Sequence, residues 1–389
     1  MSILVNSNIT TPTKEAVLEQ IKEWEGKGID LFSKSKDAQK LLDKYTKAID
    51  SIYSGLKAQS KDTIIFTSSA SEATSQIFYS FYLQYIITGR KNAIIIFERA
   101  PIEEIKLSRI LESQGCRIHR IPATVDGTFD LEIFKEYINS KTAFVSVPMV
   151  DDESGVIQPI EEIGNICQLY GVDFYCNASW AAGRVGIDLS RLPLSYMSID
   201  AELIEGPKDT ALLYINKDAT KLMPLIHGFD SEQGSLRKMI DPLKVIAFAK
   251  ALEMAVDFIE FDIEDIRELR DELEQGLLDI EGSFSLAPWA LRVPTVAIMA
   301  FEGVHGGMLL DFLAKKEIIA YSYATLSRGH FERKSLIEIA SLKEDLKYTT
   351  IGFSLNSFNT QEEIKQIITT TKELVEDIRN NISKGVCKE

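Results

Sequence analysis

The chain of 389 residues lacks several features that would point to a function class at once. It has four cysteines, and none shows the CxxC or Cys/His spacing of a metal site or a disulfide framework. No run of about 18 apolar residues occurs, and the first residues lack the basic flank and apolar centre of a secretion signal. We therefore expect reduced thiols, no metal, no membrane association and a cytoplasmic location.

Positive charge is also scarce. Lys and Arg total 43 against 58 Asp and Glu, which gives a formal net charge of -15. Nucleic acids and anionic membrane surfaces both require clustered basic side chains, so neither is an expected partner. What is present is a composition of 45% hydrophobic and 26% charged residues, long enough to form two domains with separate cores.

Apolar runs alternate with helical patterns from about residue 60 onward. The segment 102–115, for example, places its apolar residues on one helix face and ends at Gly115. Such alternation indicates βαβ units and a mainly parallel sheet. The runs expected to be strands are Thr63–Phe66, Ala93–Phe97, Ala143–Pro148 and Val172–Ala178.

A change of pattern marks the last third of the chain. Residues 256–280 space their apolar side chains at three or four positions, which predicts one long amphipathic helix joining two domains. Short apolar runs around 292–301 and 349–355 then alternate with helical stretches. We expect a large α/β domain over 14–258 and a small C-terminal domain over 259–389, which the N-terminal segment 1–13 joins.

One strand-to-helix junction has the composition of a phosphate site. In FTSSASEATSQIF, Phe66–Phe78, small hydroxyl residues follow an apolar run and open a helix. The backbone N–H groups at such a helix start can bind phosphate. Ordinary helix capping by serine explains the same residues, so the motif alone does not decide.

Several segments taken in order carry more weight. The chain contains NSNITTP at Asn6–Pro12, then FTSSASEA, VDDESGVIQPIEEIG, GVDFYCNASWAAGRVGIDL, SIDAELIEGPK and IGFSLNSF. Together these resemble the NifS-like cysteine desulfurases of the class V aminotransferase group, over nearly the whole chain. The resemblance implies the α/β fold of type I pyridoxal-phosphate enzymes: a mixed, mainly parallel seven-stranded sheet flanked by helices, a small C-terminal α/β domain, and a homodimer.

The family's chemistry requires a lysine that holds pyridoxal phosphate as a Schiff base. In the register of the resemblance this position, three residues before Gly206, is Leu203. Leucine has no amine. Lys208 is close by, but the family carries a lysine there in addition to the Schiff-base lysine.

The positions that would contact the cofactor ring differ as well. The acid that keeps the pyridine nitrogen protonated corresponds to Asn177, and the histidine that stacks on the ring corresponds to Pro101. The glutamine near the phenolic oxygen corresponds to Trp180, whose indole could fill the ring space. The asparagine of the family's NNE stretch corresponds to Asp152.

The phosphate ligands are replaced by acids. Asp200 and Glu202 stand where the family has serine and histidine, and Ile240 stands where the neighbouring subunit supplies a threonine. Each like-charge pair costs about 3 kcal/mol at roughly 5 Å and an effective dielectric near 20, whereas the helix start contributes only about 1 kcal/mol. The positions of this candidate pocket are Ala70, Ser71, Pro101, Asp152, Asn177, Trp180, Asp200, Glu202 and Ile240.

The substrate side of the family's site is also altered. The desulfurase nucleophile is a cysteine on a loop, because only a thiolate can carry sulfur as a persulfide. Its place falls near Leu326, and no cysteine occurs between Cys176 and Cys387. The arginine that clamps the substrate carboxylate corresponds to Gly352.

Other polar residues receive ordinary interpretations. The acidic turn Asp151–Glu153 could bind a cation, but a solvated loop is the favoured interpretation. Cys176 is expected to be a buried small hydrophobic residue rather than a reactive thiol. The four histidines show no catalytic or metal spacing and are assigned structural or surface roles.

These replacements lead to one functional prediction and two alternatives. We predict a homodimeric relative of the cysteine desulfurases that has no catalytic residues and no cofactor, and that binds a sulfur-transfer or iron–sulfur assembly partner. The first alternative is an enzyme whose remodelled acidic pocket acts on another small molecule. The second is a pyridoxal-phosphate-dependent cysteine desulfurase that uses a displaced lysine.

Overall fold

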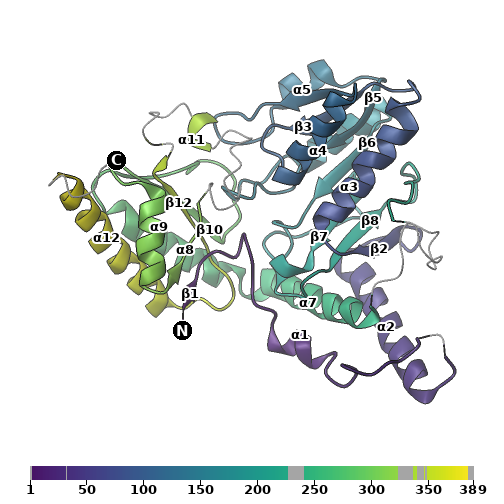
Figure 1. The fold of residues 1–389 in the computed structure, drawn as a ribbon, viewed down its shortest axis with the longest axis horizontal. Coiled ribbons are helices and arrows are strands. Elements are labelled where there is room, and N and C mark those ends of the chain that lie inside the picture. The colour runs from purple at the N-terminus through teal and green to yellow at the C-terminus, as the bar shows by residue number, and fades with distance from the viewer. Residues whose placement is uncertain are drawn as a thin grey trace.

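The computed structural model describes residues 2–31, 33–226, 241–322, 336–339, 346 and 348–383. Figure 1 shows two groups of elements, each built around its own sheet. We call the group around the seven-stranded sheet the large unit, and the group around the three-stranded sheet the small unit. The chain's first strand lies with the small unit, beside elements from the last third of the sequence (Figure 1).

The sheet of the large unit has the strand order β2-β8-β7-β6-β5-β3-β4. Strand β8 is antiparallel to both of its neighbours, and the other pairs are parallel, so the expected mixed and mainly parallel sheet is confirmed. The four strands predicted from apolar runs are all present. The strands are β2 Thr63–Thr67, β3 Ala93–Phe97, β4 Arg117–Ile121, β5 Thr142–Ser146, β6 Asp173–Asn177, β7 Tyr196–Asp200 and β8 Ala211–Ile215.

Helices flank this sheet, and local sequence signals mark where several of them begin and end. Every residue of β3 and β5 is buried, as is typical of parallel strands that helices cover on both faces. Ser35 and Asp130 cap helix starts through their side chains, and Gly171 ends a helix with a φ of 61°. The helices are α1 Glu15–Glu19, α2 Lys36–Gly55, α3 Ala70–Phe81, η1 Tyr82–Ile86, α4 Ile102–Ser113, α5 Leu131–Tyr137, α6 Ile160–Tyr170, η2 Ala201–Ile204 and α7 Pro242–Phe261.

The small unit contains an antiparallel sheet of order β12-β10-β9 and a separate parallel pair of β1 and β11. Its own hydrophobic cluster includes Ile3, Leu273, Phe301 and Phe353. Its strands are β1 Ile3–Leu4, β9 Ser283–Ser285, β10 Val296–Phe301, β11 Ile318–Ile319 and β12 Thr350–Ser354, and its helices are α8 Ile263–Leu278, α9 Gly306–Lys315, α11 Leu336–Ile339 and α12 Gln361–Ser383.

The prediction of one continuous helix over 256–280 is wrong. Helix α7 ends at Phe261 and α8 begins at Ile263, with Asp262 between them at φ -118° and ψ -12°. The two helices bury their apolar faces in different clusters: Leu252 packs in the large unit, and Leu273 in the small unit. The helix is interrupted at Asp262, close to where the chain passes from one cluster to the other.

The structure contains two hydrophobic clusters, as expected for two domains with separate cores. The domain limits 14–258 and 259–389, with the joining segment 1–13, stay a prediction. The N-terminal segment contacts both units. Ile3 pairs with Ile318 in the small unit, and the Thr13 hydroxyl donates to the Gly206 carbonyl of the large unit at 2.9 Å. In the described part of the chain, no helix is long and apolar enough to cross a membrane.

Candidate functional site

Four of the predicted pocket positions lie where strands of the large sheet end and helices begin. Asn177 ends β6 and Asp200 ends β7, while Ala70 begins α3 and Pro101 precedes α4. In open α/β sheets, ligands bind in the crevice beyond the carboxyl ends of the strands. The local fold therefore brings residues far apart in sequence to the place where such a fold holds its ligand.

The start of α3 is occupied by a carboxylate of the chain itself. Asp200 Oδ2 accepts a hydrogen bond from the Ala70 amide at 3.2 Å, and its Oδ1 accepts from the Glu202 amide at 3.1 Å. Ser69 caps the same helix by accepting from the Glu72 amide at 3.1 Å. Burial raises the pKa of Asp200, although the two amide hydrogen bonds oppose this. The N–H group that would face a phosphate thus already has an anionic partner.

Glu202, the second predicted acid, does not share this position. Its Oε1 lies 3.0 Å from Lys208 Nζ and accepts a hydrogen bond from Thr10 of the N-terminal segment. Ser71, the predicted serine at the helix start, is exposed. The Glu202 carboxylate therefore has its own cationic partner, while its charge still helps to raise the pKa of Asp200.

Asn177 and Trp180 differ in how their polar groups are satisfied. Asn177 is fully buried, and its Oδ1 accepts from the Ser179 amide at 3.0 Å, but its Nδ2 has no partner among the described residues. Trp180 donates its indole N–H to the Asn8 carbonyl at 3.0 Å. The indole is thus bonded to the N-terminal segment, whereas the buried amide donor of Asn177 is left for a further acceptor.

The register at Leu203 is fixed by a tight backbone approach. Leu203 lies in the short helix η2, and the Gly206 amide donates to the Ala201 carbonyl at 2.8 Å. A Cβ at Gly206 would lie 2.8 Å from that same oxygen, so only glycine fits there. Because the turn fixes Gly206, Leu203 keeps its place three residues earlier, where its side chain lines a cavity between the two units.

Tyr321 fills the space beside Gly352, the position of the family's arginine. The two residues exchange backbone hydrogen bonds of 3.0 and 2.8 Å. A Cβ on Gly352 would lie 2.2 Å from Cζ of the Tyr321 ring. The Tyr321 hydroxyl donates to the Glu153 carbonyl at 2.8 Å, and burial raises the pKa of the phenol well above its usual range. No side chain can enter this position unless Tyr321 moves.

The prediction that the acidic turn is a solvated loop is wrong. Asp151, Asp152 and Glu153 are all buried, at 0%, 8% and 1% exposure. Arg99 donates to both Asp151 oxygens at 2.9 and 2.8 Å and to Glu153 Oε2 at 2.8 Å. Burial alone would lower the pKa of Arg99, but the two carboxylates raise it above its usual range. The turn folds inward because a buried guanidinium needs these counterions.

A further buried acid lies on the first turn of α4. Glu104 is 0% exposed, accepts from the Ser146 hydroxyl at 2.6 Å, and has no partner for its Oε1 within the described structure. Burial raises the pKa of Glu104 to about 8, so its carboxyl is protonated at neutral pH. Cys176 is fully buried, as predicted, and burial raises the pKa of its thiol well above the usual value.

Two of the predicted positions lie outside the described residues: Leu326, at the nucleophile position, and Ile240, at the phosphate threonine position. In the remainder, no group of three or more His, Cys, Asp or Glu is arranged to hold a metal ion.

Comparisons with known proteins decide the family. The model of the family described as "Aminotransferase class-V" matches residues 3–367. The chain belongs to the class-V aminotransferase family. This confirms the resemblance on which the sequence predictions rest, and it covers both units and the N-terminal segment.

Relatives and solved structures of this family member agree. It is 29% identical to the cysteine desulfurase NifS of Azotobacter vinelandii, over 86% of this chain and 82% of that protein. It is 30% identical to the cysteine desulfurase IscS of Methylococcus capsulatus, over 81% of this chain and 78% of the relative. A solved NifS-like protein superposes with a TM-score of 0.87 at 23% identity, over 97% of this chain and 100% of that one. A second, from Rickettsia africae, gives 0.83 at 22% identity, with 97% and 100% covered.

Family membership corrects one prediction. We predicted that the chain has no cofactor, and this is wrong, because the class-V family to which it belongs is one of pyridoxal-phosphate-dependent enzymes. The residues of this class-V chain nevertheless do not fit the mode of attachment that the resemblance implies. Leu203 offers no amine, and the Asp200 carboxylate is bonded to the α3 start.

The sequence analysis missed four residues that the structure makes prominent: Arg99, Glu104, Arg184 and Tyr321. Two of them stand in quoted or neighbouring segments, in FERAP and GRVGID, but nothing in the local sequence marks a buried arginine. Their partners are distant in the chain, for example Asp151 for Arg99 and Gly352 for Tyr321. Only the fold reveals these contacts.

Proposed function

We propose that this class-V aminotransferase family member does not release sulfur from cysteine itself, and acts as a homodimeric binding or regulatory protein. Its partner would belong to sulfur transfer or iron–sulfur assembly, because its curated relatives include cysteine desulfurases. The proposal concerns covalent attachment and turnover of cysteine.

The observation that carries this proposal is the fixed register of Leu203. A cysteine desulfurase must form and exchange a Schiff base through one lysine amine. The Gly206 turn leaves no room to shift a neighbouring residue into the place of Leu203. Lys208, two residues after Gly206, is mostly exposed and pairs with Glu202.

The substrate side supports the same conclusion. The chain has no cysteine between Cys176 and Cys387, so the family's nucleophile loop carries no thiol. Gly352 cannot bear an arginine side chain while the Tyr321 ring stays in place. An enzyme that lost only one of these groups could recover by a single compensating change, but three separate losses require three.

Covalent attachment gives the direct test. Purified full-length protein is incubated with pyridoxal phosphate, reduced with borohydride, digested, and analysed by mass spectrometry. We expect no stoichiometric adduct on any lysine, and no cysteine-dependent sulfide release in the same preparation. An active cysteine desulfurase treated in parallel provides the positive control.

A stoichiometric adduct, on Lys208 or on any other lysine, together with sulfide release would establish the displaced-lysine alternative instead. Light scattering on the purified protein after size-exclusion chromatography tests the homodimer separately. We expect a single species of twice the chain mass, and a monomer would contradict that part of the proposal. Partner capture from native lysate, with sulfur-transfer proteins as the expected class, tests the remaining part.

A further inference from the structure

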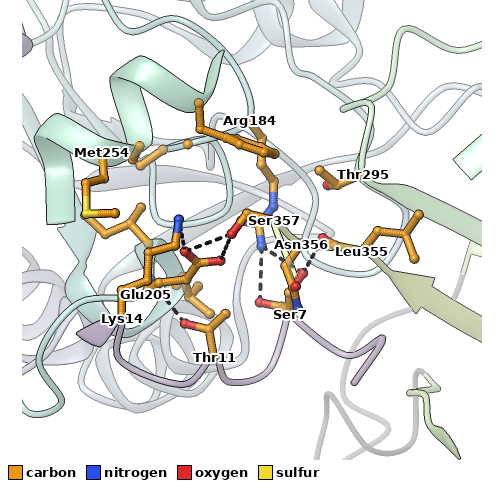
Figure 2. A pocket seen from close by; sticks show the side chains of 16 residues that line it. Ser7, Thr11, Lys14, Arg184, Glu205, Met254, Thr295, Leu355, Asn356 and Ser357 are labelled. Atoms are coloured by element: carbon orange, nitrogen blue, oxygen red, sulfur yellow. Dashed lines mark hydrogen bonds and ion pairs between the residues drawn. The ribbon is translucent and has the colours of Figure 1, made fainter. Parts of the chain in front are cut away.

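A small cavity of about 40 Å³ lies where the N-terminal segment, the large unit and the small unit meet. We call it the junction cavity. Its charged lining residues are Lys14, Arg184 and Glu205, and Thr295 lines it just before β10. Figure 2 shows the Arg184 side chain extending from the large unit towards Ser7 of the N-terminal segment. Leu203 is the one position of the predicted family site that lines this cavity, and none of the predicted cofactor-pocket positions does, so its other lining residues call for their own explanation.

Arg184 is a buried cation whose hydrogen-bond partners in the described structure are all neutral. It is 6% exposed and donates to the Trp180 carbonyl at 3.2 Å, to the Ser7 carbonyl at 3.1 Å and to the Ser7 hydroxyl at 3.4 Å. Within the described residues, no carboxylate forms an ion pair with it. Burial lowers the pKa of Arg184 to about 10 although the Glu205 carboxylate, itself paired with Lys14, opposes this, and Arg184 stays charged at neutral pH. A buried charge without a counterion costs several kcal/mol, so its retention calls for an explanation.

The Arg184 guanidinium also has N–H groups that donate to no described residue. It carries five N–H groups in a planar fork, and its contacts with Trp180 and Ser7 use at most three of them. This fork matches the two oxygens of a carboxylate, which can accept two parallel hydrogen bonds from it. The geometry of the residue itself thus favours a carboxylate over a spherical anion.

Thr295 provides a second, independent observation. It is 1% exposed, and its Oγ1 has no hydrogen-bond partner among the described residues. Buried hydroxyls are rarely left without a partner, because desolvating one without a hydrogen bond costs about 1–3 kcal/mol. An acceptor in the junction cavity would satisfy this hydroxyl.

The charge of the cavity indicates how many charges its ligand carries. Lys14 Nζ and Glu205 Oε2 form an ion pair at 2.6 Å and cancel, so the single positive charge of Arg184 remains. Apolar side chains, among them Met254, Phe258 and Leu355, form much of the remaining wall. We propose that the junction cavity binds a small monocarboxylate of about the size of acetate or propionate, its carboxylate on Arg184 and Thr295 and its short apolar end against this wall. Because the wall comes from three parts of the chain, such a ligand links the two units and the N-terminal segment.

Calorimetry with simple carboxylates tests the site on the full-length protein. Acetate, propionate and butyrate are titrated at constant ionic strength, with propionamide as the neutral match of propionate. We expect saturable binding of at least one carboxylate, a concentration-dependent rise in unfolding temperature, and no binding of propionamide. Absence of carboxylate binding, or equal binding of propionamide, would overturn the proposal.

Variants then assign the contact. Arg184→Met is expected to weaken carboxylate binding about tenfold or more, the usual loss for one charge-assisted hydrogen-bond pair. Thr295→Val, which is nearly isosteric and safe for folding, is expected to weaken it about threefold or more. Arg191→Met removes an equal charge from a side chain that is 85% exposed and should bind as the wild type does.

Unchanged affinity in both Arg184→Met and Thr295→Val, with native circular dichroism, would contradict the assignment, and so would an equal loss in Arg191→Met. Neither result depends on lysine adducts or sulfide release. Failure of the carboxylate proposal can therefore be told apart from failure of the proposed function.

Discussion

Arg99 and Arg184 are both buried arginines, but Arg99 forms ion pairs with acidic side chains, whereas Arg184 donates hydrogen bonds to neutral groups. Arg99 is enclosed by Asp151 and Glu153, which form its ion pairs at 2.8 Å. Arg184 contacts only carbonyl and hydroxyl oxygens in the described residues. A buried cation that has its own counterions stabilises the fold. A buried cation that lacks an ion pair is the place where binding of an external anion would release the most free energy.

Replacing Arg99 should have the largest effect. Arg99→Met leaves two buried carboxylates without their counterion, and breaking a buried pair in this way costs about 3–5 kcal/mol. Urea unfolding at pH 7 measures the loss. The exposed control Arg191→Met should stay within about 0.5 kcal/mol of the wild type. A loss for Arg99→Met no larger than that for Arg184→Met would remove the basis of the comparison.

Glu104 is a buried acid that is neutral because it holds a proton. Its protonation predicts that the free energy of unfolding depends on pH. The carboxyl titrates near the ordinary glutamate pKa of 4.5 when the chain is unfolded, and at a pKa of about 8 when it is folded. Between these values only the folded state holds the proton, so this group makes the wild type less stable as pH rises through that window. Above about pH 8 both states are ionised, and the full cost of the buried charge is present.

Glu104→Gln removes that titration while keeping an acceptor for the Ser146 hydroxyl. The stability difference between Glu104→Gln and the wild type should shift in favour of the variant by roughly 2–4 kcal/mol between pH 5 and pH 9, since one pKa unit corresponds to about 1.4 kcal/mol. Urea unfolding at pH 5, 7 and 9 measures this difference. A difference that stays constant across the series would mean that Glu104 is not protonated in the folded protein.

Arg184→Met should cost much less than Arg99→Met in the absence of ligand. It leaves no carboxylate unpaired, and relief of the unpaired charge offsets the hydrogen bonds lost by Ser7 and Trp180. We expect a net change of about 1 kcal/mol or less in unfolding free energy. A loss as large as about 4 kcal/mol would place Arg184 in the scaffold, with Arg99.

Thr295→Val should have the smallest effect of the series. Removing a buried hydroxyl that has no partner is expected to leave stability unchanged or to raise it by about 0.5–1 kcal/mol. Thr74 supplies the matched control, because it is fully buried and its hydroxyl lies 2.8 Å from that of Tyr175. Thr74→Val should lose about 1 kcal/mol in the same unfolding measurement. Equal losses for the two variants would show that Thr295 is bonded in solution.

The fold was largely predictable, because apolar runs such as Ala93–Phe97 are buried on both faces and carry their own signal. The predicted single helix failed at Asp262, where the chain passes from one hydrophobic cluster to the other. Spacing along one helix cannot show that its two halves face different cores, so a local pattern cannot place such a turn.

The site was predictable only where its chemistry is local. Leu203 and Gly352 were located by their neighbours in the chain, whereas the fate of each pocket acid depends on distant atoms. Asp200 bonds an amide 130 residues away, and the acidic turn is buried because Arg99, 52 residues from Asp151, supplies a charge. The type of a buried polar side chain predicts that it needs a hydrogen-bond or ion-pair partner. Which residue is that partner is set by the tertiary structure.

The pairing of β1 has a consequence for synthesis. Ile3 is made long before its strand partner Ile318, and the Ser7 hydroxyl meets that of Ser354, 347 positions later. During synthesis β1 must therefore stay unpaired until the strands of the small unit have been translated. Contacts of such long range form slowly, which makes docking of the first strand a late event in maturation.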